Sequence, residues 1–132
     1  MSRVEVLQYS RAELEKNITI LYYPNQTSFI YNSEAELFED NQSIGSFVVN
    51  NFITKSRDGK DLLNANGTFV TPLGIIEVLF TSRFRTDKGI LGNKQLVKCS
   101  IVHTTGKYLD ATAVTILALG DEAKTSIVSI VF

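Results

Sequence analysis

Residues 96–132, with the sequence LVKCSIVHTTGKYLDATAVTILALGDEAKTSIVSIVF, decide the fold class of this chain. Three runs rich in Val, Ile, Leu and Thr are separated by two turn clusters, HTTGK at 103–107 and GDEAK at 120–124. β-branched residues favour strands, and short clusters with Gly and Asp favour turns between them. The stretch therefore predicts an antiparallel meander of three strands and argues against helices.

The same pattern continues toward the N-terminus. Further strand-like runs lie at 4–9, 18–23, 28–31, 45–54, 62–70 and 74–86. In the last run, one face carries Ile76, Val78, Phe80, Ser82 and Phe84, and the other carries Glu77, Leu79, Thr81, Arg83 and Arg85. Such alternation is typical of a strand with one face on a core and the other toward water. Asp58–Gly59 predicts a hairpin turn, because both residue types tolerate positive φ.

Two segments near the N-terminus allow two interpretations each. Ser10 and Glu13 have the spacing of a helix capping box, so 11–16 is either a short helical turn or a plain loop. The segment SEAELFE at 33–39 fits a helical turn or an edge strand.

Seven to nine strand candidates, with no long amphipathic helix, predict an all-β protein. We expect an eight-stranded antiparallel β-barrel, with a β-sandwich as the alternative. A length of 132 residues predicts one domain over 1–132. A barrel of about eight strands either fills its interior with side chains or holds one small ligand.

Composition narrows the classes of partner. Thirteen basic and fourteen acidic residues give a net charge of −1 and predict neither a nucleic-acid face nor a membrane-binding patch. The single cysteine, Cys99, excludes an internal disulfide and a zinc site of several cysteines, and no ligand spacing predicts a metal or other cofactor. No signal-peptide pattern opens the chain, which favours a cytoplasmic location, with a mature secreted form as the alternative.

The segment TTGKYLDATAVTIL at 104–117 resembles a motif, G-[ST]-G-x-[FY]-x-x-A-x-G, of the allene oxide cyclase and dirigent family. Gly106, Tyr108 and Ala111 occupy matching positions, whereas Thr104 and Ala113 replace glycines of the motif. Bacterial spirotetronate cyclases have a similar barrel. The resemblance covers roughly residues 37–132. It implies an eight-stranded barrel that acts on an apolar small molecule without a cofactor and assembles as a homo-oligomer.

The catalytic residues of that family do not carry over. The carboxylate and amide residues that the cyclases use on their first strand have no counterpart in VEVLQYS at 4–10. His103, the single histidine, is the one candidate for a catalytic role, as a general acid or base. It shares its strand parity with Cys99, so both would line one cavity wall if that face points inward. At about 13 Å apart they are too distant to activate each other. The alternative makes His103 a turn residue and Cys99 a small core side chain.

Asn50 and Phe80 complete the candidate ligand-binding set with Cys99 and His103. Asn50 and Asn51 lie mid-strand between apolar residues, so one of them should point inward on a closed sheet. A buried amide must be hydrogen-bonded, either to a ligand or to a neighbouring backbone group.

Two functional hypotheses follow. The first is a barrel that binds an apolar small molecule and works as a cofactor-free isomerase or cyclase, or as a dirigent-like protein. The second is a non-catalytic structural or interaction barrel that forms an oligomer. Whether the chain is an enzyme depends on whether the barrel interior is open or packed.

Overall fold

Nine strands and two short helical segments make up the described part of the chain. The computed structural model describes residues 3–132 except 18, 26–27, 55–59, 86–94 and 121. In chain order the elements are β1 (Val4–Ser10), α1 (Arg11–Lys16), β2 (Thr19–Asn25), β3 (Ser28–Glu39), β4 (Gln42–Thr54), β5 (Lys60–Thr71), β6 (Gly74–Arg85), β7 (Gln95–Thr104), η1 (Gly106–Tyr108), β8 (Ala113–Ala118) and β9 (Thr125–Val131).

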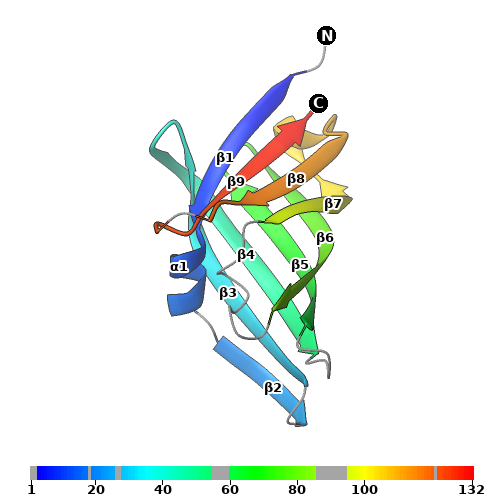
Figure 1. Cartoon of the computed structure of the whole chain (residues 1–132). Helices are drawn as coiled ribbons and strands as arrows, with labels where there is room; N and C mark the ends of the chain where they lie inside the picture. Colours follow the sequence, from blue (N-terminus) through cyan, green and yellow to red (C-terminus); the bar gives the residue numbers. More distant parts are fainter. Residues whose placement is uncertain (1–2, 18, 26–27, 55–59, 86–94, 121) are drawn as a thin grey trace.

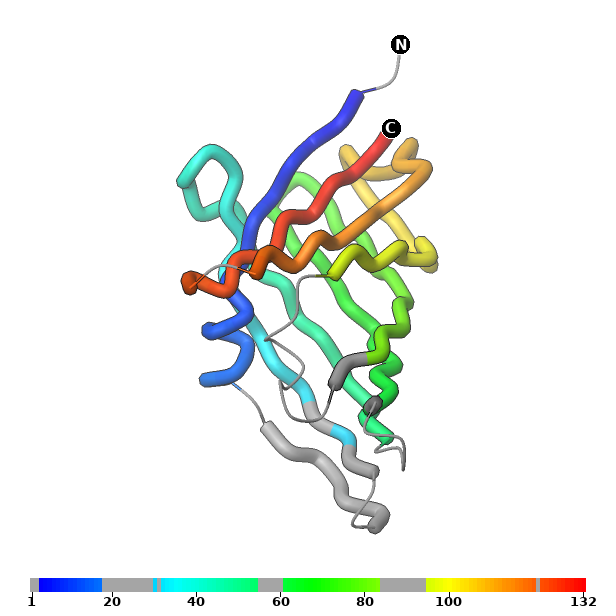
Figure 2. Tube along the Cα trace, in the orientation of Figure 1, coloured from blue at the N-terminus to red at the C-terminus, as the bar shows by residue number. Residues whose placement is uncertain are grey.

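The strands form one antiparallel sheet in the order β1-β9-β8-β7-β6-β5-β4-β3-β2. The sheet closes because β1 also pairs with β3, with Gln8 opposite Phe38. Eight strands therefore make a closed barrel, while β2 extends β3 beyond it (Figures 1 and 2). The predicted eight-stranded antiparallel barrel is confirmed, and the β-sandwich alternative is wrong.

Side-chain alternation selects the inner face of each strand. Along β4, Phe47, Val49, Asn51 and Ile53 are buried, and the residues between them are exposed. A strand period of two sends these residues to the barrel interior. On β6 the predicted inner face is confirmed at Ile76 and Val78, which are fully buried.

Helix α1 covers the part of the β3 edge that no strand pairs. The side-chain oxygen of Ser10 accepts a hydrogen bond from the Glu13 main-chain N–H at 3.2 Å, so the helical interpretation of 11–16 is confirmed. Glu13 Oε1 accepts from the main-chain N–H of Glu36 at 3.1 Å, and Asn17 Nδ2 donates to the carbonyl of Glu34 at 3.0 Å. The segment 33–39 is a strand whose free backbone groups are satisfied by α1.

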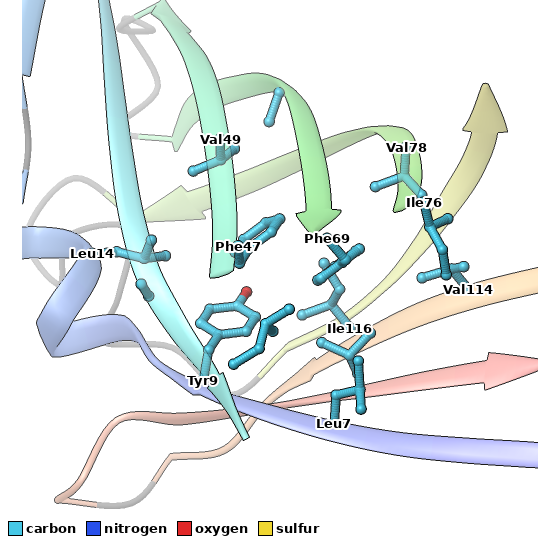
Figure 3. Packing of buried hydrophobic residues seen from close by; sticks show 14 of the residues in the cluster. Leu7, Tyr9, Leu14, Phe47, Val49, Phe69, Ile76, Val78, Val114 and Ile116 are labelled. Carbon is cyan, nitrogen blue, oxygen red and sulfur yellow. The ribbon is translucent and has the colours of Figure 1, made fainter. Parts of the chain in front are cut away.

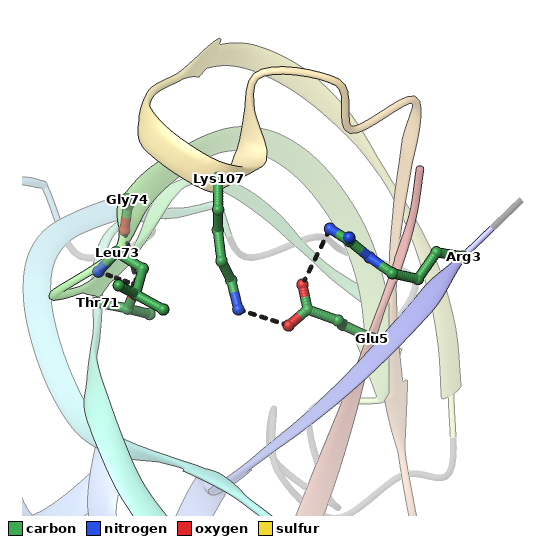
Figure 4. A network of polar contacts seen from close by, with 6 residues as sticks. All are labelled: Arg3, Glu5, Thr71, Leu73, Gly74 and Lys107. Carbon is green, nitrogen blue, oxygen red and sulfur yellow. Dashed lines mark hydrogen bonds and ion pairs between the residues drawn. The ribbon is translucent and has the colours of Figure 1, made fainter.

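The segment that follows β7 plugs one end of the barrel. Tyr108 of η1 is fully buried, and Lys107 Nζ lies 2.6 Å from Glu5 Oε1 of β1 (Figure 4). Gly106 has a φ of +61°, and the main-chain N–H of Lys107 donates to the carbonyl of Leu73 at 3.0 Å. The predicted turn glycine thus supplies both positive φ and a close backbone approach.

The chain turns between β3 and β4 at Asp40–Asn41, where φ is +50° and +65°. Such positive angles are typical of a tight hairpin. The predicted Asp58–Gly59 turn lies outside the described residues. No helix within the described ranges has the length and apolar character needed to cross a bilayer.

Replacing Gly106 with alanine should destabilise the barrel by about 2–4 kcal/mol. An added Cβ would lie 2.1 Å from the carbonyl oxygen of Leu73, at a φ that L-residues rarely adopt. Chemical denaturation would measure the loss. Leu109→Ala, at a neighbouring exposed position, should change the unfolding midpoint little. Equal midpoints for the two variants would contradict the close backbone approach.

Candidate functional site

The two halves of the barrel interior differ. Aromatic rings fill the middle: Phe47 and Phe69 stack with centroids 4.5 Å apart, and Tyr9 lies 4.8 Å from Phe47 (Figure 3). Toward the η1 end the interior is packed by fully buried aliphatic side chains such as Ile76 and Ile130. Toward the α1 end it opens into a cavity of about 100 Å³.

Inward side chains from the barrel strands and from α1 line this cavity. The apolar ones are Leu14, Phe47, Val49, Leu63, Phe80, Val97, Ile116 and Ala118. The polar ones are Tyr9, Arg11, Glu15, Ser33, Asn51, Ser82, Gln95 and Ser126. The aromatic stack is the floor, and α1 stands at the other end. Apolar atoms nevertheless form most of the cavity surface, as is usual for a small-molecule site.

Arg11 holds the β8–β9 connection against the cavity rim. Its Nη1 donates to the carbonyl of Thr125 and, at 3.3 Å, to the Ser126 hydroxyl, and its Nη2 donates to the carbonyl of Leu119. The side chain is buried. These bonds commit the guanidinium to main-chain acceptors, so its role in the cavity wall is structural.

Tyr9 presents a neutral phenol to the cavity floor. Burial raises the pKa of Tyr9 to about 12, although its hydrogen bond with Ser126 and the charge of Arg11 act in the opposite direction. The phenol therefore stays protonated at neutral pH. The phenol can contribute to the shape of the cavity and form hydrogen bonds, but at neutral pH it cannot act as a base.

Asn51 brings an unpaired donor to the same cavity. Its side chain is buried, and within the described chain no acceptor pairs with its Nδ2. Asn50, the amide that we placed in the ligand-binding set from sequence, is exposed on the outer face. The expectation that one of the pair points inward is confirmed, with Asn51 as the inner residue.

Ser82 and Gln95 bridge β6 and β7 at the α1 end of the barrel. The Ser82 hydroxyl donates to Gln95 Oε1 at 2.8 Å, and Gln95 Nε2 donates to the carbonyl of Arg83 at 3.1 Å. The backbone pairing of β6 with β7 runs from Ile76 to Leu79. The side-chain bridge continues the wall beyond that pairing.

His103 does not share the inward face of Cys99, which was the condition for a role in the cavity. Val78 pairs with Ile101 but Glu77 pairs with His103, so Val102 is an extra residue on β7. A bulge of this kind shifts every later side chain to the opposite face. His103 is consequently exposed on the outer surface beside Glu77. Ligand binding by His103 or by Asn50, which are both exposed on the outside of the barrel, stays a prediction.

The other two predicted site residues face the interior. Phe80 lines the cavity. Cys99 is half-buried and packs against the core, and burial raises the pKa of its thiol to about 12. No group of three or more His, Cys, Asp or Glu residues in the described ranges is arranged to hold a metal ion.

Sequence reasoning missed Tyr9, Arg11 and Ser126. The second half of β1 carries the signal for Tyr9, because Leu7 and Tyr9 flank the polar Gln8 and Ser10 follows. For Arg11 and Ser126 the local sequence carries no signal. Arg11 and its partner Thr125, for instance, are 114 residues apart in the sequence.

The chain shares its fold with solved structures of low sequence identity. A pyocyanin demethylase superimposes with a TM-score of 0.60 at 12% identity over 98% of each chain. AbnU, an exo-specific intermolecular Diels-Alderase, gives 0.59 at 13% identity over 100% of this chain and 98% of its own. A nonspecific heme-binding cyclase that catalyses a [4 + 2] cycloaddition during neoabyssomicin biosynthesis superimposes with a TM-score of 0.61 at 9% identity. The match covers 98% of this chain and 63% of that protein's chain.

No family model and no curated protein sequence matches the chain. The structural neighbours agree with the cyclase-barrel part of the expected resemblance. The narrower likeness to allene oxide cyclases and dirigent proteins stays an expectation. At these identities the comparisons establish the barrel fold.

Cys99 should react slowly with iodoacetamide in the native protein at pH 8. A pKa of about 12, against 9.0 for an ordinary thiol, leaves little thiolate, and the thiolate is the nucleophile. Labelling should accelerate as the pH rises toward 12 and when the protein is unfolded in guanidinium chloride. Equal rates for native and unfolded protein at pH 8 would contradict the buried thiol.

Proposed function

We propose that the protein binds a small, mostly apolar molecule in the cavity between the aromatic floor and α1. In this proposal it acts on that molecule as a cofactor-free isomerase or cyclase. The cavity itself carries the proposal, because one half of the barrel is left open while the other is packed solid. A barrel with a purely structural role gains stability by filling that space.

The cavity wall suits catalysis by positioning. Tyr9 is neutral, and Arg11 is engaged with main-chain carbonyls. Phe47, Val49 and Phe80 give a fixed apolar shape. Holding a flexible molecule in a reactive conformation away from water accelerates unimolecular ring closure without any proton transfer.

The comparisons support a small molecule as the ligand. Two of the neighbouring structures are described as a Diels-Alderase and a [4 + 2] cyclase, and a third as a demethylase of pyocyanin. These are different reactions on the same barrel, so the fold alone does not select one. The open interior of the present chain supports the proposal that it binds a ligand.

The carboxylate in the described cavity wall is Glu15, which is exposed and lies 3.4 Å from Lys124 Nζ. Glu15 is thus held at the outer rim by an ion pair. This arrangement favours shape-based chemistry over general acid catalysis at the floor.

Filling the cavity should weaken binding of the neutral fluorophore N-phenyl-1-naphthylamine. Val49→Phe adds a ring inside the barrel, and Val48→Phe adds the same ring outside, because consecutive strand residues face opposite ways. We expect wild type and Val48→Phe to bind the fluorophore and Val49→Phe to bind roughly tenfold more weakly or worse. Fluorescence titration measures the difference.

Circular dichroism would confirm that both variants fold. Because a larger core residue can strain a strand, Ala118→Phe near the other end of the cavity gives a second block. Unaltered fluorophore binding by both inner variants, or no binding by wild type, would refute the proposed function.

The alternative, a non-catalytic interaction barrel, has one observation in its favour. Large apolar side chains are exposed on the outer faces of β6 and β7, at Leu79, Leu96 and Val102. The side chain of Leu96, for example, is 60% exposed. Apolar side chains grouped on an exposed face are typical of a surface that binds another protein. Under this proposal the face is covered by another copy of the chain.

Leu79→Glu should then lower the molar mass measured by light scattering toward that of a monomer. A buried carboxylate at an apolar interface is strongly unfavourable. Gln42→Glu, which adds the same charge at the exposed start of β4, is the control and should leave the mass unchanged. A wild-type protein that is monomeric at all concentrations tested would remove this alternative.

A further inference from the structure

The unpaired amide of Asn51 is the feature of the cavity that the packing does not explain. Asn51 is 5% exposed, and its Nδ2 has no hydrogen-bond partner within the described chain. A buried donor left without an acceptor costs stability, so such groups are rare in native structures. Its presence among apolar cavity residues points to an acceptor supplied from outside the chain.

No backbone carbonyl of the described residues accepts a hydrogen bond from Asn51 Nδ2. On β4, Asn51 pairs with Tyr31 of β3 on one side and with Ala65 of β5 on the other. Both flanking strands are therefore occupied by ladder pairing. The sequence alternative, in which the inner amide satisfies a neighbouring backbone group, is not what the structure shows.

Space lies in front of the amide. Ala65, its cross-strand neighbour, ends at Cβ, and Phe80, which faces Ala65 from β6, forms the adjoining wall. The next inward residue on β4 toward the floor is Val49. A ligand group that reaches Asn51 thus meets one donor in an otherwise apolar corner.

Three other polar groups of the cavity have partners. Arg11 binds the Thr125 and Leu119 carbonyls, the Tyr9 hydroxyl bonds to Ser126, and Ser82 bonds to Gln95. The cavity therefore offers a ligand an amide donor and presents no unengaged charge at its floor. That combination selects a neutral molecule with a hydrogen-bond acceptor.

We infer that Asn51 determines specificity by donating an Nδ2–H hydrogen bond to a carbonyl oxygen of a neutral, otherwise apolar ligand. The ligand class is a ketone, ester or lactone on a hydrocarbon frame. This inference rests on the proposed function, because it needs the cavity to be the binding site. A hydrogen bond to that oxygen also draws electron density from the carbonyl, so recognition and activation of a conjugated ligand come from one contact.

The test compares two probes of the same shape, acetophenone and α-methylstyrene, which differ by C=O against C=CH₂. Each displaces N-phenyl-1-naphthylamine from wild type and from Asn51→Leu, and the ratio of the two dissociation constants is measured for each protein. The ratio removes differences in probe hydration and cavity shape. We expect Asn51→Leu to lose the relative preference for acetophenone by about fivefold.

Asn64→Leu is the matched control. Asn64 is an exposed asparagine on β5, so its removal should leave the ratio at the wild-type value. Asn51→Ala removes the amide without adding a branched side chain and should reproduce the effect of Asn51→Leu. Infrared spectra of bound acetophenone should show a carbonyl stretch at lower wavenumber in wild type than in either Asn51 variant.

The possible outcomes separate the inference about Asn51 from the proposed function. Equal ratios in wild type and both Asn51 variants, with the fluorophore still bound, would overturn the inference and leave the proposed function intact. Failure of wild type to bind the fluorophore would remove the proposed function and the inference together. Asn51→Leu should also raise the melting temperature, since it removes an unpaired buried donor. A lower melting temperature would mean that the amide is structurally paired and would overturn the inference.

Discussion

Closure of the sheet at β3 is the constraint on which the rest of the structure depends. One edge of β3 pairs with β4 along its whole length, with one register shift after Leu37, but the other edge is shared by β2, α1 and β1. An unpaired strand edge exposes backbone donors and acceptors, so each stretch of it needs a partner. Glu13 of α1 and Asn17, its C-cap residue, supply side-chain bonds where no strand reaches. The barrel therefore closes with a helix in its wall, and that helix stands over the open half of the interior.

The division of the interior into a packed half and an open half follows from residue size. Phe47, Phe69 and Tyr9 meet at the middle, and fully buried aliphatic residues fill the space from there to Tyr108. Beyond the aromatic rings the inward positions carry smaller or polar residues, including Ser33, Ala65 and Ala118. These cannot meet across the barrel, and a cavity remains. Packing at one end supports the fold while the other end is free to bind.

Polar groups in the open half serve different purposes. Arg11 ties the start of β9 and the end of β8 to α1, across a separation of more than 100 residues in sequence. The Tyr9 phenol and Ser126 bond to each other at the floor. Asn51 differs from both, because its donor is unpaired within the described chain. A structure generally tolerates such a cost where binding recovers it. This contrast is why the proposed chemistry centres on a neutral ligand with one acceptor.

By itself the sequence determined the strand content, the inner face of β6 and the turn glycine Gly106, because alternation and glycine conformation are local properties. It also indicated that one of two neighbouring asparagines, Asn50 or Asn51, has its side chain inside the barrel. Only the tertiary structure decided which of the two lies inside, since the inward face of β4 depends on how the strand sits in the closed barrel with strands distant in sequence. The bulge at Val102 had no sequence signal, and it turned His103 outward although simple alternation placed it with Cys99. The cavity likewise depends on which side chains meet across the closed barrel, and that is set by register and closure, which no single segment encodes.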